Sequence, residues 1–208
     1  MVATGVQYRR PPLDRLEEFE GAGIYYAATE IEARYCRETE AVIIGGGNSA
    51  GQAAMFLSRS ARCVRVLVRG ASLAASMSSY LSSRLAADPR IAIEFGADVS
   101  ALHGDAHLEA VTVRDAASGA TRVVETRALF IMVGAVPNTD WRSGLVDLDA
   151  KGFVITGLGS SAGPFGTSRP GIFAVGDVRA GSVKRVASSV GEGSVVISKV
   201  WEHVNRKA

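Results

Sequence analysis

The stretch EAVIIGGGNSA, residues 40–50, decides the fold class. Its first five residues form a short apolar run that is typical of a buried parallel strand. Three glycines end that run, and AGQAAMFLSRSAR, residues 50–62, has the alanine-rich composition of a packed helix. A second apolar strand follows in CVRVLV, residues 63–68. Strand, glycine turn, helix and strand in this order predict a βαβ unit and therefore an α/β fold.

The glycine turn matches a dinucleotide-binding fingerprint. Gly45-x-Gly47-x-x-Ala50 follows a strand and opens a helix, which is the context that the fingerprint requires. The first glycine permits the tight turn, the second lets the backbone approach a pyrophosphate, and Ala50 keeps helix and strand close. Asn48 and Ser49 are residue types that cap helices, so they are expected to bond the first helical amides or the phosphates. The alternative is a glycine turn that only connects strand to helix.

The residues beyond the loop favour NADPH over NADH. A site for NAD usually places an acidic residue about 20 residues further on, where it binds the ribose 2′-hydroxyl. From Gly45 onward the first acidic residue is Asp88, well beyond the second strand. Arg69 follows that strand directly, and its guanidinium suits a 2′-phosphate. The alternative is an ordinary solvated Arg69 and a site that takes NAD.

Further elements predict a Rossmann-like, three-layer ββα domain. A helix is expected over residues 77–87 and a strand over 91–95. Residues 108–114 and 122–126 alternate apolar and polar side chains around a turn, which predicts an antiparallel pair in a β-meander. A buried strand at 128–133 and a final helix at 183–204 follow. Trp201 is expected to pack on the apolar face of that helix.

Composition and charge exclude several classes of protein. Of 208 residues, 47% are hydrophobic and 21% charged, and the formal net charge is +2. The basic residues are scattered, which argues against nucleic-acid binding, and no apolar run reaches the ~20 residues of a membrane span. The N-terminus lacks the apolar core of a signal peptide, so a cytoplasmic location is expected. Two cysteines and three separated histidines predict neither a disulfide framework nor a metal site.

Five motifs resemble, in order, those of low-molecular-weight thioredoxin reductases. They are ATG (3–5), IIGGGNSA (43–50), GAVPNT (134–139), RPGIFAVGDV (169–178) and KRVASSVGEG (184–193). The first and third resemble the links between the flavin and nucleotide domains of that family, and the second resembles its NADPH loop. The resemblance implies an NAD(P)H-binding domain at residues 12–134. It also implies that residues 1–11 and 135–208 come from an FAD-binding domain.

The resemblance also implies residues that contact the flavin. Gly134 lies at the return to the flavin domain. Gly176 and Asp177 belong to the terminal flavin motif, whose aspartate bonds the ribityl chain of FAD. Arg185 and Val186 occupy the place that faces the flavin pyrimidine ring. Hydride transfer between cofactors needs no side chain as general acid or base, so no catalytic residue is assigned.

The implied function is delivery of hydride from NADPH to FAD in an oxidoreductase whose electron acceptor is unknown. The family begins with its own GxGxxG loop for FAD, upstream of the position of Ala3. The chain is therefore expected to be truncated before that loop and to hold FAD only if the missing half is present. By itself it is expected to be inactive. A homodimer is a further expectation.

The redox dithiol of the family is missing. Ala27 and Glu30 stand where its two cysteines belong, and neither residue can form a mixed disulfide. Cys36 lies further along as a lone thiol. Together with SMSSYLSSR, residues 76–84, these departures resemble the reductase-like proteins that are fused to a cyclic-nucleotide-binding domain. Two alternatives stay open, a dithiol-free reductase of the ferredoxin or flavin type and a non-catalytic nucleotide-binding module.

Overall fold

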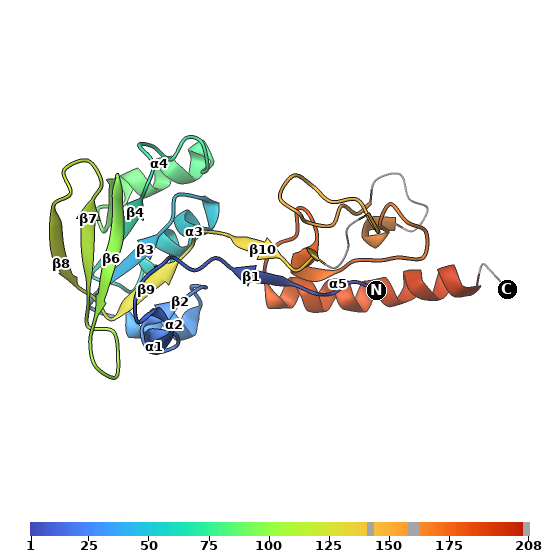
Figure 1. The fold of residues 1–208 in the computed structure, drawn as a ribbon, viewed down its shortest axis with the longest axis horizontal. Helices are drawn as coiled ribbons and strands as arrows, with labels where there is room; N and C mark the ends of the chain where they lie inside the picture. Colours follow the sequence, from blue (N-terminus) through green and yellow to red (C-terminus); the bar gives the residue numbers. More distant parts are fainter. Residues whose placement is uncertain (141–143, 158–162, 206–208) are drawn as a thin grey trace. The chain divides into compact units, whose positions relative to one another are not determined.

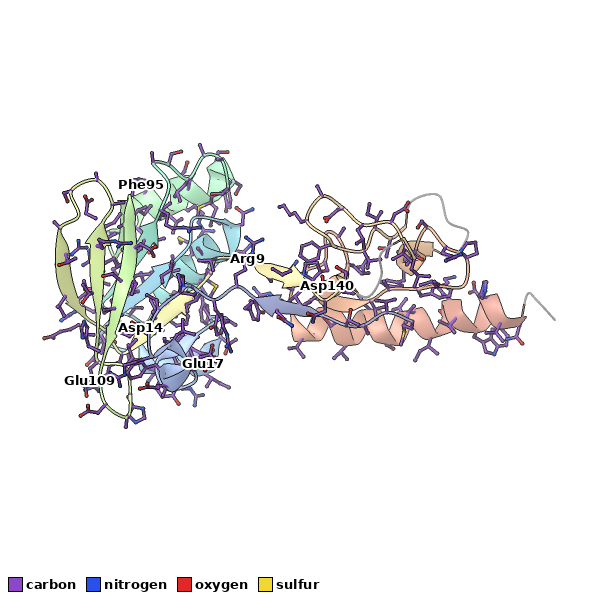
Figure 2. All side chains as sticks on the ribbon, viewed as in Figure 1. Arg9, Asp14, Glu17, Phe95, Glu109 and Asp140 are labelled. Atoms are coloured by element: carbon purple, nitrogen blue, oxygen red, sulfur yellow. The ribbon has the colours of Figure 1, made fainter. Side chains whose placement is uncertain are left out.

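The computed structural model describes residues 1–140, 144–157 and 163–205. The chain forms two compact units, one continuous (Arg10–Val133) and one that combines Met1–Arg9 with Gly134–Ala208 (Figure 1). Arg9, labelled in Figure 2, lies at one of the two crossings between the units, and Gly134 lies at the other. The backbone N–H of Arg9 donates to the Gly134 carbonyl over 3.0 Å.

The continuous unit is built on a five-stranded parallel sheet. In spatial order its strands are β2 (Ile24–Tyr25), β9 (Ala128–Ile131), β3 (Glu40–Ile44), β4 (Cys63–Val68) and β5 (Ile91–Phe95). All neighbouring pairs run parallel. The central strands β3 and β9 are almost wholly buried, as strands that are covered on both faces must be. The predicted α/β class with a Rossmann-like parallel sheet is confirmed.

Helices cover one face of this sheet (Figure 1). Ala41 and Ile43 of β3 pack there against Ala50 and Leu57, in a core that contains residues of three helices. These helices are α2 (Glu30–Tyr35), α3 (Asn48–Leu57) and α4 (Ser79–Ala87).

A three-stranded antiparallel meander covers the opposite face. It consists of β6 (Ala97–His103), β7 (Ala110–Asp115) and β8 (Thr121–Glu125). Val42 and Ile44 of β3 pack against Val111 of β7, and the short helix α1 (Leu16–Phe19) joins this core through Phe19. Because successive strand residues point to opposite faces, β3 serves two cores at once. The result is the predicted three-layer ββα arrangement.

Two strands of the continuous unit are absent from the sequence-based prediction. In β6 the register with β7 shifts between Val99 and Ala101. Such a bulge interrupts the two-residue alternation by which a half-buried strand is recognised. The second strand, β2, has only two residues, Ile24 and Tyr25, and it is a strand because it pairs with β9. Pairing of that kind leaves no local pattern in the sequence.

The discontinuous unit contains little sheet. β1 (Val6–Tyr8) pairs antiparallel with β10 (Ala135–Pro137), and Val2 forms a single parallel bridge with Ala174. In the described part of the unit the short 3₁₀ turns η2 (Gly163–Phe165) and η3 (Gly176–Val178) precede the 20-residue helix α5 (Val186–Asn205).

One face of α5 carries apolar side chains that are exposed. Val196 is fully buried, in a small core with Phe165, Phe173 and Val175. Trp201, by contrast, is 67% exposed, so the prediction that it packs on the unit is wrong. The apolar periodicity of the helix is real, but only one side of it meets a core in this chain. Among the described residues, no helix has both the length and the apolar character needed to cross a membrane.

Candidate functional site

The loop between β3 and α3 is held against the neighbouring strands. Gly45 adopts φ +146°, and a Cβ added there would lie 2.5 Å from the carbonyl oxygen of Met132, next to β9. The Gly45 N–H donates to the Leu67 carbonyl of β4 over 3.0 Å. Only glycine combines this φ with so close a backbone neighbour. The same hypothetical Cβ would be 3.2 Å from the Cβ of the buried Ala50, so helix and strand lie close together at this point.

Helix α3 begins at Asn48, two residues before the start of the helix predicted from residue 50. Gly47 is the N-cap, with extended backbone (φ −93°, ψ 177°) and no side chain to cap the helix. Asn48 and Ser49 lie inside this first turn and do not cap it, so of the two partners expected for them the helical amides are excluded and binding to the phosphates stays a prediction. The first helical bond runs from the Gly51 N–H to the Gly47 carbonyl over 3.1 Å. The N–H groups of residues 48–50 precede that bond and point out of the helix start, where an anion is favoured.

The Asn48 side chain bonds a distant segment. Its Oδ1 accepts a hydrogen bond from the backbone N–H of Ser78 over 2.9 Å, and Ser78 is the N-cap of α4. The hydroxyl of Ser76 donates to the Gly46 carbonyl over 2.7 Å. The sequence contains the SMSS motif but offers no sign that it reaches the glycine loop, because these partners are 30 residues apart.

A second glycine holds α3 and α4 together. A Cβ on Gly51 would lie 2.7 Å from the Leu81 side chain and 2.9 Å from the Met77 side chain. Leu81 and Met77 are both buried in the helical core. Gly51 thus lets α4 and the segment before it approach the start of α3.

Arg69 lies directly after β4 and is exposed. Within residues 1–140, 144–157 and 163–205 it has no ion-pair partner. Since the carboxyl ends of parallel strands share one edge of the sheet, Arg69 and the glycine loop lie at the same edge. An arginine with no acid beside it can neutralise an added phosphate.

The residues expected on the flavin side lie in the other unit. Gly176 has φ +76°, and its N–H donates to Oε2 of Glu192 over 2.6 Å. The Ser189 hydroxyl donates to Oδ1 of Asp177 over 3.3 Å. Gly176 and Asp177 form η3, and Ser189 and Glu192 belong to α5, so these bonds hold the turn on the helix.

Arg185 and Val186 form the start of α5, and Gly134 has φ +92° beside β10. Both residues at the helix start are exposed, Val186 to 83%. The Ser189 N–H donates to the Arg185 carbonyl over 3.0 Å, which makes this the first helical bond of α5. Two groups of candidate residues therefore result: the glycine loop with Arg69 in one unit, and Gly134 with the α5 start in the other.

The two positions expected for a redox dithiol, Ala27 and Glu30, lie at the start of α2. Thr29 is the N-cap of α2, and it forms a reciprocal capping box with Glu32. Ala27 and Glu30 are both exposed and carry no sulfur. Cys36 is buried at the other end of α2, where its thiol donates to the Glu32 carbonyl over 3.5 Å. Burial, aided by the Glu32 charge, raises the pKa of the Cys36 thiol to about 12, so it is not a ready nucleophile.

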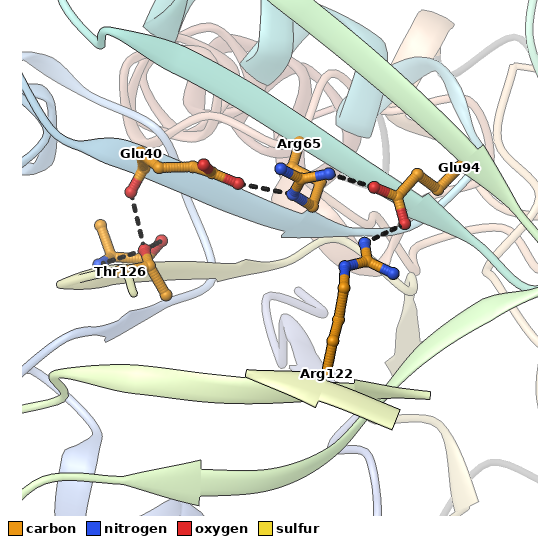
Figure 3. A network of polar contacts seen from close by, with 6 residues as sticks. Glu40, Arg65, Glu94, Arg122 and Thr126 are labelled. Atoms are coloured by element: carbon orange, nitrogen blue, oxygen red, sulfur yellow. Dashed lines mark hydrogen bonds and ion pairs between the residues drawn. The ribbon is translucent and has the colours of Figure 1, made fainter. Parts of the chain in front are cut away.

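An ion-pair network ties the parallel sheet to the meander (Figure 3). Arg65 of β4 donates to Glu40 of β3 over 2.5 Å and also to Glu94 of β5, and Arg122 of β8 donates to the same Glu94. Burial raises the pKa of Glu94, but the hydrogen bonds from Arg122 and Arg65 outweigh it and lower the pKa overall. The network lies on the meander face of the sheet. Among the described residues, no group of three or more His, Cys, Asp or Glu side chains could hold a metal ion.

Comparison with known proteins identifies the family. Residues 1–193 match the family model described as pyridine nucleotide-disulphide oxidoreductase. The chain is 34% identical over 193 residues to the thioredoxin reductase of Streptomyces clavuligerus, which covers 93% of this chain and 58% of that protein. It is 31% identical to the thioredoxin reductase of Treponema pallidum, over 99% of this chain and 64% of that one.

The fold leads to the same family. The crystal structure of thioredoxin reductase from Streptococcus pyogenes superposes with a TM-score of 0.81 at 28% identity, covering 98% of this chain and 64% of that one. The chain thus spans about three fifths of the length of these relatives. It belongs to the pyridine nucleotide-disulphide oxidoreductases, as a thioredoxin reductase-like member of that family.

Proposed function

We propose that the chain is the NADPH-binding portion of a thioredoxin reductase-like, FAD-dependent oxidoreductase. The glycine loop supports this most directly. Gly47 places no side chain at the start of α3, and the N–H groups of residues 48–50 are left for an anion. The pyrophosphate of a dinucleotide has the charge that this position favours. The residues therefore fit the nucleotide that family membership implies.

Arg69 supports NADPH as the preferred nucleotide. Its guanidinium is exposed at the edge of the sheet that also carries the glycine loop. The chain from Gly45 to Ala87 contains no acidic residue that could accept from a ribose 2′-hydroxyl or repel a 2′-phosphate. Charge-assisted bonds to phosphate are among the stronger polar contacts in proteins.

FAD is the second cofactor that we propose, at the residues of the discontinuous unit. Asp177 would bond its ribityl chain, and Arg185 with Val186 would face its pyrimidine ring, with Gly176 and Gly134 shaping the turns. When bound, FAD supplies the acceptor for the hydride of NADPH. These residues fit only the ribityl and ring end of the cofactor, so we expect the isolated chain to purify without flavin. Homodimer formation and the resemblance to cyclic-nucleotide-linked reductases stay predictions.

The start of α2 favours a second candidate, a dithiol-free reductase that passes electrons to a carrier other than a disulfide. Disulfide reduction needs an attacking thiolate and a resolving thiol. Ala27 and Glu30 provide neither, and Cys36 is buried with a raised pKa. The electron acceptor of the whole protein would then be reached without a local dithiol.

Calorimetric titration of NADPH and NADH into the purified chain tests the proposed function. We expect NADPH to bind more tightly, and Arg69→Ala to weaken NADPH by about 10- to 100-fold while it leaves NADH nearly unchanged. Arg59→Ala is the matched control, because Arg59 is an exposed arginine beyond the opposite end of α3. Equal affinity for both nucleotides, unaltered by Arg69→Ala, would refute the NADPH assignment.

A further inference from the structure

The segment Ser76–Ser78, here called the serine latch, contacts the glycine loop through two hydrogen bonds, and the latch is the donor in both. The Ser76 hydroxyl donates to the Gly46 carbonyl over 2.7 Å, and the Ser78 N–H donates to Oδ1 of Asn48 over 2.9 Å. Met77 between them is 5% exposed and belongs to the helical core. The latch is therefore anchored by one buried side chain and two polar contacts.

The glycine loop is shaped to receive this segment. A Cβ on Gly46 would lie 3.0 Å from Cγ1 of Val68 and 3.6 Å from the Ser76 hydroxyl. A Cβ on Gly47 would lie 3.7 Å from the Ser76 carbonyl oxygen. Both glycines thus have the latch as a close neighbour. The latch therefore lies beside the loop that forms the proposed nucleotide site.

The bond from Ser78 fixes the orientation of the Asn48 side chain. A backbone N–H can only donate, so the atom of Asn48 that it meets is the amide oxygen. The nitrogen is the other terminal atom of the carboxamide, so the bond to Ser78 does not use it. Among the described residues this nitrogen has no hydrogen-bond acceptor, and Asn48 is exposed at the first position of α3. Its two N–H groups are therefore not engaged, on a residue at the end of α3 that would meet a pyrophosphate.

We propose that the serine latch positions Asn48 for the pyrophosphate of the pyridine nucleotide. The latch holds the amide oxygen away from the phosphates and presents the amide nitrogen to them. Ser76 and Ser78 act through Asn48 and the loop backbone, so they are positioning residues. This inference rests on the proposed nucleotide site and adds how that site is oriented.

The latch and Arg69 serve different parts of the nucleotide. The pyrophosphate is common to NADPH and NADH, whereas the 2′-phosphate belongs to NADPH alone. Loss of the latch is therefore expected to lower the affinity for NADPH and the affinity for NADH by the same factor. Loss of Arg69 is expected to weaken NADPH selectively. The ratio of the two affinities separates the two contributions.

Titration of NADPH and NADH into latch variants tests the inference. We expect Ser76→Ala and Asn48→Ala each to weaken both nucleotides by about 2- to 10-fold, since each loses one neutral hydrogen bond. The double variant should lose less than the product of the single losses, because the two residues act as one unit. Ser82→Ala is the control, because its hydroxyl also donates to a backbone carbonyl, that of Ser79, but within α4.

Asn48→Asp separates latching from phosphate binding. Aspartate keeps an oxygen for the Ser78 N–H but replaces the amide nitrogen by a second, charged oxygen that repels phosphate. We expect Asn48→Asp to weaken both nucleotides more than Asn48→Ala does. Amide hydrogen exchange at Ser78, measured without nucleotide, should be faster in Asn48→Ala than in wild type and stay slow in Asn48→Asp.

Three results would overturn the inference, and they differ from each other. Wild-type binding of both nucleotides that Ser76→Ala and Asn48→Ala leave unchanged would refute the latch while the proposed function stands. If the rate of amide hydrogen exchange at Ser78 is the same in wild type and in Asn48→Ala, the fixed orientation of the Asn48 side chain is refuted. A wild-type chain that binds neither nucleotide would refute the proposed function, and the latch inference with it.

Discussion

Both carboxylate oxygens of Glu192 in α5 accept hydrogen bonds from Arg179. Oε1 lies 2.5 Å from Nη2, and Oε2 lies 3.0 Å from Nε. The second of these oxygens also accepts the Gly176 N–H over 2.6 Å. Both side chains of the pair are 15% exposed. Glu192 therefore joins the η3 turn, which carries Asp177, to the long helix.

Glu192→Ala should destabilise the discontinuous unit by roughly 2–4 kcal/mol. The substitution leaves a largely buried guanidinium without its carboxylate and removes the acceptor of the Gly176 N–H. Trp201 belongs to this unit, and the sequence of the continuous unit, residues 10–133, contains no tryptophan, so urea unfolding followed by tryptophan fluorescence reports on the discontinuous unit.

Glu202→Ala is the control for that measurement. Glu202 pairs with Lys199 on the same helix, but the two side chains are 42% and 33% exposed. Screening by water limits such a pair to about 0–1 kcal/mol. If the two substitutions cost the same free energy of unfolding, the Arg179–Glu192 pair does not hold the turn.

Gly45→Ala should destabilise the nucleotide-binding unit by roughly 2–4 kcal/mol. The added methyl group would meet the Met132 carbonyl oxygen at 2.5 Å, and φ +146° is unfavourable for alanine. Urea unfolding followed by circular dichroism measures the loss. Gly119→Ala is the matched control, because Gly119 has φ +70° and open space around it, so only the conformational cost of about 1–2 kcal/mol applies there. An equal loss in both variants would mean that the contact with β9 does not require glycine.

Glu94→Gln should lower the free energy of unfolding near neutral pH by roughly 1–3 kcal/mol. It removes the carboxylate that Arg65 and Arg122 share across the sheet and the meander (Figure 3). Arg122→Ala should cost less, about 0–1 kcal/mol, because the Arg122 side chain is 46% exposed.

The effect of Glu94→Gln depends on pH in a definite direction. Although burial alone would raise the pKa of Glu94, the bonds from Arg122 and Arg65 lower it below its unfolded value. Its contribution is therefore complete above the unfolded pKa, near 4.5, and is lost as the pH falls through the lower folded pKa. Urea titrations of wild type and Glu94→Gln should give curves that differ at neutral pH and converge in acid. A difference that grows in acid would contradict the assigned direction.

Cys36 should resist thiol reagents in the native chain. Burial and the nearby Glu32 raise its pKa from 9.0 to about 12, which reduces the thiolate fraction by about a thousandfold at neutral pH. Reaction with a small aromatic disulfide should be much slower at Cys36 than at the partly exposed Cys63 and should become fast for both in denaturant. Cys36→Ser and Cys63→Ser assign the two rates. Fast native reaction that disappears in Cys36→Ser would show that Cys36 is an accessible, reactive thiol and would contradict its assigned burial and raised pKa.

Several elements could be located from the sequence because their causes are local. Strands β3, β4 and β5 lie at the predicted residues 40–44, 63–68 and 91–95, since a strand in a covered parallel sheet is rich in apolar residues. The turn at Gly45 is likewise visible, because a run of glycines between an apolar run and a helix-forming run is a local signal. The family resemblance along the chain then implied the remaining architecture.

Other features depend on partners that the local sequence does not specify. The spacing of apolar residues in the final helix predicts that Trp201 is packed. In the folded unit a different side of α5, the one that carries Val196, is buried, and Trp201 is exposed. Cys36 is visible in the sequence only as a lone thiol, whereas its burial at the end of α2, which raises its pKa, depends on the folded unit.

The sequence by itself determined the α/β class, the glycine loop and the loss of the dithiol, all of which are written in consecutive residues. Tertiary structure alone decided the role of Asn48. Its residue type suits a helix cap, but Gly47 takes that position and the Asn48 oxygen bonds Ser78. A hydrogen bond across 30 residues exists only once α3 and α4 have packed together, with Gly51 against Leu81. Periodicity and propensity describe neighbours along the chain, and they carry no information about that contact.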